Sequence, residues 1–198
     1  MEESGTNRLE TFSDGVFAIA ATLLVLEFSF KTGRGAPPLG DQLLHNWHPY
    51  LAYATSFLTI AIIWINHHHL METIARVDRT FLFINALLLL VVAFIPFPTR
   101  LVAEALGEPA AFTYGGTLLL MALVFNALWA YAQWNRRLIR EDFPQAKVRA
   151  VTQASALGVP MTGFVLLLAT WTPLGSVIFA FAISAFYLPG AAMLFDRS

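Results

Sequence analysis

The chain has 198 residues, 57% hydrophobic and 13% charged, with a formal net charge of −1. Soluble domains average about 45–50% apolar and about 25% charged residues, so this charge density cannot cover a soluble surface and predicts a membrane protein. The lack of cysteine excludes disulfides, thiolate metal sites and thiol nucleophiles. The small net charge gives no indication of nucleic acid binding.

Six apolar segments are long enough to cross a bilayer as helices, for which about 20 residues are needed. They cover about residues 12–30, 50–70, 80–98, 111–134, 151–170 and 176–195. The apolar stretches are long and do not alternate with polar residues, which argues against strands. Two prolines in the sequence PFPTR are expected to end the third segment. We therefore predict an all-α membrane protein in which residues 1–198 form one domain of six transmembrane helices.

The Lys and Arg residues predict the orientation, because they concentrate in cytoplasmic loops. Placing the N-terminus, the 71–79 loop, the 135–150 loop and the C-terminus on one side gives that side nine of them and the other side three. The nine are Arg8, Arg76, Arg79, Arg136, Arg137, Arg140, Lys147, Arg149 and Arg197, and the three are Lys31, Arg34 and Arg100. Both termini are therefore expected in the cytoplasm of a multi-pass cell-membrane protein.

The first segment carries an apolar stripe on one side of its helix. At about 100° per residue, this side holds Phe12, Gly15, Ile19, Thr22, Leu23, Leu26 and Phe30. Asp14 points nearly the opposite way, beside small residues that let helices approach closely in lipid. Taken alone, the stripe favours lipid contact or ordinary helix packing.

Asp14 stands where the first apolar segment begins. The sequence Thr11 to Asp14 matches a capping box at a helix N-terminus. An ionisable group at membrane depth is costly and is usually paired or functional. We therefore also expect a partner for Asp14, with Arg8 and the histidines of the second segment as candidates.

The stretch RLETFSD resembles the signature of the transmembrane-protein-175 family of potassium channels: Arg, three variable residues, then Phe-Ser-Asp. Arg8, Phe12, Ser13 and Asp14 match it, and the similarity continues through Glu27. The single six-helix unit resembles the prokaryotic branch. The resemblance implies a homotetrameric potassium channel with K⁺ as permeant monovalent cation, no cofactor, and a pore lined by the four first helices.

The resemblance also implies roles for individual residues. Ile19, five residues after the motif aspartate, would form the narrowest ring, with Leu23 and Leu26 continuing the pore and Thr22 beside the constriction. An apolar ring cannot replace an ion's hydration shell, which favours K⁺ over the more strongly hydrated Na⁺. Glu27 is equally consistent with two positions: at a pore mouth, where its charge would concentrate cations, or at the lipid interface.

Three consecutive histidines, His67 to His69, end the second segment. They point in three directions on a helix, so no shared metal is expected. His68, Glu72 and Arg76 share a face and are predicted to form a ladder of charged pairs. The resemblance favours anchoring of the first helix by the motif residues with His67 and His68, through bonds to Ser13 or Asp14. Histidines ordinarily titrate near neutral pH, which also suggests pH sensitivity.

Other polar residues and other function classes complete the prediction. Asn85 and Asn126 are expected to bond between helices. The alternative to a channel is a secondary transporter coupled to protons or a small solute, but transporters tend to show repeats and broken helices. No defensible spacing of nucleophile and base indicates an enzyme, and a structural membrane protein that does not conduct stays open.

Overall fold

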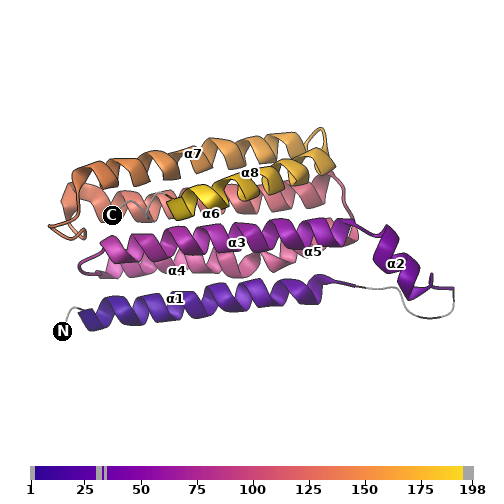
Figure 1. Cartoon of the computed structure of the whole chain (residues 1–198), viewed down its shortest axis with the longest axis horizontal. Helices are drawn as coiled ribbons and strands as arrows, with labels where there is room; N and C mark the ends of the chain where they lie inside the picture. The colour runs from indigo at the N-terminus through magenta and orange to yellow at the C-terminus, as the bar shows by residue number, and fades with distance from the viewer. Residues whose placement is uncertain (1–2, 30–32, 34, 194–198) are drawn as a thin grey trace.

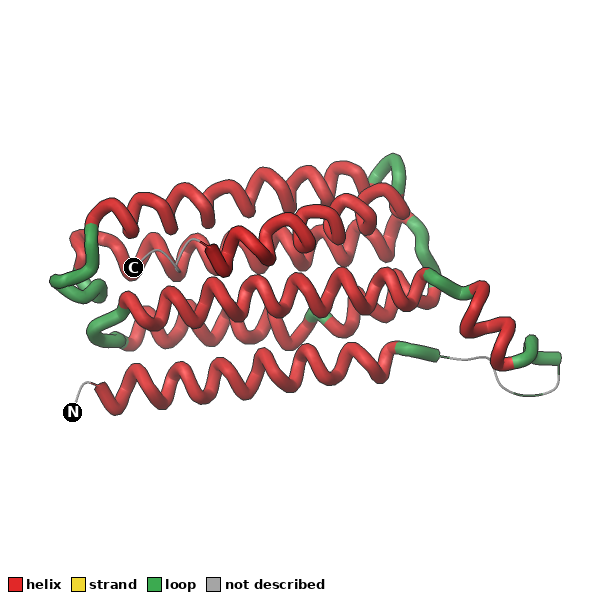
Figure 2. The backbone as a smooth tube through the Cα atoms, in the orientation of Figure 1, coloured by secondary structure: helices red, strands yellow, loops and turns green. Residues whose placement is uncertain are grey.

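The computed structural model describes residues 3–29, 33 and 35–193. Its regular elements in this part of the chain are helices, which confirms the predicted all-α class (Figures 1 and 2). The α-helices are α1 (Glu3–Leu23), α2 (Leu39–His45), α3 (His48–Thr73), α4 (Arg79–Phe94), α5 (Pro96–Glu104), α6 (Glu108–Gln133), α7 (Gln145–Ala169) and α8 (Pro173–Met193). Short 3-10 turns, η1 (Leu24–Glu27) and η2 (Trp134–Arg136), follow α1 and α6.

The long helices form a bundle in which α1 lies at one edge and α7 at the opposite edge (Figure 1). Neighbours pack as α1 on α3 and α4, α4 on α6, α3 on α8, and α7 on α6 and α8. Five helical stretches of the described chain are long and apolar enough to cross a membrane, and Pro173–Tyr187 of α8 is a shorter apolar helix. The fold is that of a multi-pass membrane protein.

The first helix begins earlier than predicted, at Glu3 rather than near residue 12. Thr11 and Asp14 therefore lie inside α1, and the predicted capping box is wrong: the Thr11 hydroxyl donates to the carbonyl of Asn7 (2.8 Å). Hydropathy marks only the apolar part of a helix, and the polar residues before it continue the same helix. Phe30, at the predicted end of this segment, lies outside the described residues.

The prolines of PFPTR do not end the helical stretch as predicted. α4 ends at Phe94 and α5 begins at Pro96. Proline is tolerated at the first position of a helix, because the N–H that it lacks would have no partner within the helix there. Ile95 between them keeps helical dihedral angles (φ −52°, ψ −41°), and Thr99 N–H donates to its carbonyl (3.2 Å). The interruption is local, and α5 continues from α4 (Figure 1).

The α3–α4 and α6–α7 loops meet at the same end of the bundle. Ile74 and Ile139 form an antiparallel bridge, supported by Ala75 N–H to the Leu138 carbonyl (2.8 Å) and Arg140 N–H to the Thr73 carbonyl (3.0 Å). The N-terminal end of α1 lies at this end too (Figure 1). Three residues counted for orientation, Lys31, Arg34 and Arg197, lie outside the described residues.

Asp78 joins three elements at this end. Its carboxylate accepts from Phe81 N–H (2.9 Å), capping α4, and from the Tyr131 hydroxyl of α6 (2.7 Å). Arg137 lies 3.3 Å away. The Phe81 N–H, together with Tyr131 and Arg137, lowers the pKa of Asp78 below its ordinary value of 3.8, because these groups favour the ionised form.

Replacing Asp78 by Ala is expected to lower the free energy of unfolding by about 1–2 kcal/mol. Because the pKa is lower in the folded state, the ionised carboxylate stabilises the fold above the ordinary pKa, and this stabilisation is lost as pH falls through the folded pKa. Asp78→Asn can still cap α4 but carries no charge, so it should flatten the acid dependence of unfolding measured in detergent. An unchanged acid dependence in Asp78→Asn would contradict this role.

Candidate functional site

The first helix has one covered and one bare face. It packs against α3 and α4 on one side (Figure 1), where four side chains are at most 2% exposed: Ser13, Phe17, Ala20 and Leu24. The opposite side holds large apolar residues that the single chain leaves exposed: Phe12 (63%), Ile19 (60%), Leu23 (41%) and Leu26 (71%). A contiguous apolar surface of this kind indicates contact with lipid or with another protein surface.

The four residues predicted to line a pore lie together along this bare face. Ile19, Leu23 and Leu26 are exposed apolar side chains, and Thr22 is exposed between them. The Thr22 hydroxyl donates to the carbonyl of Ile19 on the same helix (2.9 Å), so its proton is already engaged. Leu26 belongs to the η1 turn, where the α-helix has tightened.

Three fully buried polar residues tie the covered face of α1 to the bundle. Asn85 of α4 donates its amide N–H to the Ser13 hydroxyl oxygen (3.1 Å), and its carbonyl oxygen lies 2.8 Å from Nε2 of His67 on α3. Ser13 donates in turn to the Leu9 carbonyl (2.8 Å). All three side chains are 0% exposed. The expected bond from a histidine to Ser13 is therefore replaced by a relay through Asn85.

The relay assigns the proton of His67. The Asn85 amide that donates to Ser13 leaves only its oxygen to face His67, so Nε2 of His67 must donate. Nδ1 of His67 is buried and has no partner among the described residues, and the Phe17 ring of α1 packs at 5.4 Å from the imidazole. The imidazole is thus packed between α1 and α4.

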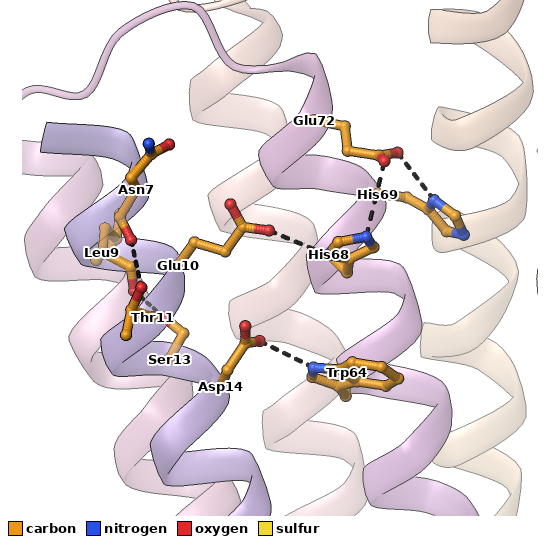
Figure 3. A network of polar contacts seen from close by, with 10 residues as sticks. All are labelled: Asn7, Leu9, Glu10, Thr11, Ser13, Asp14, Trp64, His68, His69 and Glu72. Atoms are coloured by element: carbon orange, nitrogen blue, oxygen red, sulfur yellow. Dashed lines mark hydrogen bonds and ion pairs between the residues drawn. The ribbon is translucent and has the colours of Figure 1, made fainter. Parts of the chain in front are cut away.

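A second, more exposed set of contacts links α1 to α3 (Figure 3). Trp64 donates its indole N–H to Asp14 (2.9 Å), and Nδ1 of His68 lies 3.0 Å from Glu10. The partner of Asp14 is therefore on the second predicted span, as expected, but it is a tryptophan. The other candidate, Arg8, is exposed and makes no hydrogen bond or ion pair with a described residue.

The predicted ladder from His68 to Arg76 stops after one step. Nε2 of His68 lies 3.7 Å from Glu72, which also contacts His69 at 3.2 Å. Arg76 lies beyond the end of α3, so it leaves the helical face and donates to the Arg137 carbonyl (3.2 Å). Sequence reasoning missed Glu10 and Trp64. Glu10 stands four residues before Asp14, and Trp64 stands four residues before His68. Each therefore shares a helical face with another residue of the network, and this spacing was the signal in the sequence.

Glu27 lies off the bare face. Its side chain is 19% exposed and sits 3.9 Å from Arg100 of α5, which pairs more closely with Glu104 (2.9 Å). The prediction that Asn126 bonds between helices is confirmed by its N–H to the Ser155 carbonyl of α7 (3.0 Å). Within the described residues, no group of three or more His, Asp or Glu side chains is arranged to hold a metal ion.

Comparison with known proteins identifies the class to which these features belong. Residues 8–96 match the family model described as endosomal/lysosomal potassium channel TMEM175. A potassium channel of Chamaesiphon minutus is 42% identical over 92% of this chain and 94% of the relative, and one of Streptomyces collinus is 44% identical over 82% of each. The crystal structure of a lysosomal potassium-selective channel TMEM175 homolog from Chamaesiphon minutus superposes with a TM-score of 0.85, at 38% identity, covering 95% of this chain and 98% of that one.

These likenesses place the protein among membrane-embedded potassium channels. The chain belongs to the TMEM175 family. It is a potassium channel, not an enzyme, and channels of this family need no cofactor. The family supports the channel over the alternative of a secondary transporter.

The relay makes a testable claim about two hydroxyls of α1. Ser13→Ala leaves the buried Asn85 amide without its acceptor and should lower the free energy of unfolding by about 1–3 kcal/mol. Thr11→Ala is the matched control, because Thr11 also bonds back to its own helix but is exposed. It should change stability by less than about 0.5 kcal/mol. Equal effects of both changes on thermal unfolding in detergent would exclude the relay as a stabilising contact.

Proposed function

We propose that four copies of this chain form a K⁺ pore lined by the bare faces of their α1 helices. Each subunit would contribute six membrane-spanning helices, with both termini in the cytoplasm. The observation that carries the proposal is the exposed apolar stripe from Phe12 to Leu26, opposite a face that is fully buried. One subunit offers a single such stripe, so a closed pore requires several copies arranged about an axis.

The constriction is proposed at Ile19, with Leu23 and Leu26 continuing the pore and Thr22 beside them. These side chains offer no charge and no free carbonyl ring, so they cannot replace the water around an ion. Passage then favours the cation whose water deforms more easily, which gives K⁺ a preference over Na⁺. A ring of this kind also closes by losing its water.

The polar contacts on the other side of α1 have a supporting role in this proposal. The relay through Asn85 and the bonds of Asp14 and Glu10 all leave from the covered side of the helix or its flank. They fix the rotation of α1 about its axis and so determine which side chains face the pore. Arg8 and Phe12, the remaining motif residues, are exposed in the single chain and are proposed to contact neighbouring subunits.

Two features concern the ends of the pore. The paired α3–α4 and α6–α7 loops and the start of α1 lie at one end of the bundle, which supports a common cytoplasmic side. Glu27 has Arg100 within 3.9 Å, so its charge is partly balanced within the subunit. We therefore give it no part in attracting cations.

The proposal is tested by ion flux into liposomes that contain the purified protein. Ile19→Asn adds a polar group to the constriction and should reduce the preference for K⁺ over Na⁺, by tenfold if about 1.4 kcal/mol of discrimination is lost. Leu90→Asn is the matched control: Leu90 of α4 is 66% exposed and apolar, but lies on a helix that is not proposed to line the pore. It should leave the preference unchanged.

Three outcomes would overturn parts of the proposal. If Ile19→Asn and wild type show the same selectivity for K⁺, the selectivity filter does not lie on α1. Equal loss in Ile19→Asn and Leu90→Asn would point to a general effect of polar residues in the membrane. Absence of a tetramer in the purified, conducting protein would exclude the proposed assembly.

A further inference from the structure

A cavity of about 180 Å³, open on one side, lies between α3, α6, α7 and α8. All its lining residues belong to these four helices, so it is separate from the α1 face. The walls are mainly apolar, with Ile62, Ile63, Phe125, Met161 and Val165 among them. The cavity exceeds the apolar cavities of about 150 Å³ that take up small hydrocarbons.

The cavity exists because small residues stand where the helices face each other. Ala154 and Gly158 of α7, Ala122 of α6 and Ala180 of α8 line it. A Cβ atom added at Gly158 would meet no atom within 4 Å. α7 packs on α6 and α8 rather than on α3, and the space between α7 and α3 stays unfilled. An unfilled apolar space forfeits the contacts that its walls could make.

One end of the cavity carries a positive charge. Lys147, in the first turn of α7, is half-buried and lines the cavity together with His69 and Thr73 near the end of α3. In the described part of the chain, the Lys147 ammonium has no hydrogen-bond or ion-pair partner. This is the end of the bundle where the α3–α4 and α6–α7 loops pair, so the charge lies where a membrane-spanning bundle meets water.

We infer that the cavity binds a segment of one acyl chain of an anionic phospholipid, with the lipid phosphate at Lys147. The apolar walls suit the hydrocarbon chain, and basic pockets between membrane helices on the cytoplasmic side suit anionic headgroups. A neutral hydrocarbon would offer the lysine no counter-charge. A zwitterionic headgroup would bring its own cation toward the lysine, so an anionic headgroup is the better complement.

The test uses the full chain purified in detergent, with bound lipid counted by native mass spectrometry. The probes are phosphatidylglycerol and phosphatidylcholine with identical acyl chains. Wild type is expected to retain phosphatidylglycerol about tenfold more tightly, a difference typical of one well-placed charge contact. Gly158→Leu fills the cavity and should weaken that binding about tenfold, whereas Lys147→Gln should remove the preference between the two lipids.

Each variant has a control on the same helix. Gly163 also has no atom within 4 Å of an added Cβ but does not line the cavity, so Gly163→Leu should bind as wild type does. Arg149 is an exposed cation two positions after Lys147 and does not line the cavity, so Arg149→Gln should keep the preference.

Several results would overturn the inference. They are equal retention of both lipids by wild type, unchanged binding in Gly158→Leu, or an equal loss of preference in Lys147→Gln and Arg149→Gln. Retention of oleate in place of phosphatidylglycerol would assign the site to a free fatty acid and reject the phospholipid. If Gly158→Leu does not fold, Lys147→Gln carries the test alone, and an unchanged preference in that variant rejects the site.

Discussion

The hydrogen bond from Asn85 to Ser13 is the contact on which the arrangement of the first helix depends. It joins α4 to the covered face of α1 where the side chains are fully buried, and His67 is the second hydrogen-bond partner of the same amide. A buried amide that loses either partner is left unsatisfied, so only one rotation of α1 keeps the network intact. That rotation leaves Ile19 and Leu26 bare on the other side.

The two faces of α1 therefore have complementary tasks. On one face, directional hydrogen bonds allow a single rotation of the helix about its axis. The contacts of Asp14 with Trp64 and of Glu10 with His68 reinforce this rotation at the flank of that face. The other face needs no partner from the bundle, because its side chains are apolar apart from Thr22, whose hydroxyl donates within its own helix. This division explains how acidic residues are tolerated on a helix within a membrane protein: Asp14 and Glu27 each turn toward a donor or cation of their own subunit.

Much of this arrangement was predictable from the sequence, and the failures have physical causes. Hydropathy located the apolar parts of the helices, and helical periodicity placed Ile19 and Leu26 on one stripe. Neither could find the polar first turns of α1, because those residues are helical without being apolar. The prolines after Phe94 were misread because proline interrupts a helix and also favours the first position of the next one. The spacing of Trp64 relative to His68 did not identify it as the partner of Asp14, since helix rotation decides between Trp64 and the histidines three and four residues further along α3.

The most direct test of the central claim uses the chain's lack of cysteine. Single cysteines placed along α1 would be exposed to Ag⁺, a monovalent cation that binds thiolates, during K⁺ flux through the reconstituted protein. The account predicts rapid block at positions 19, 22, 23 and 26, and protection at positions 17, 20 and 24. Equal block at positions of the bare and the buried face, or no block at any of the seven positions, would contradict a pore lined by α1.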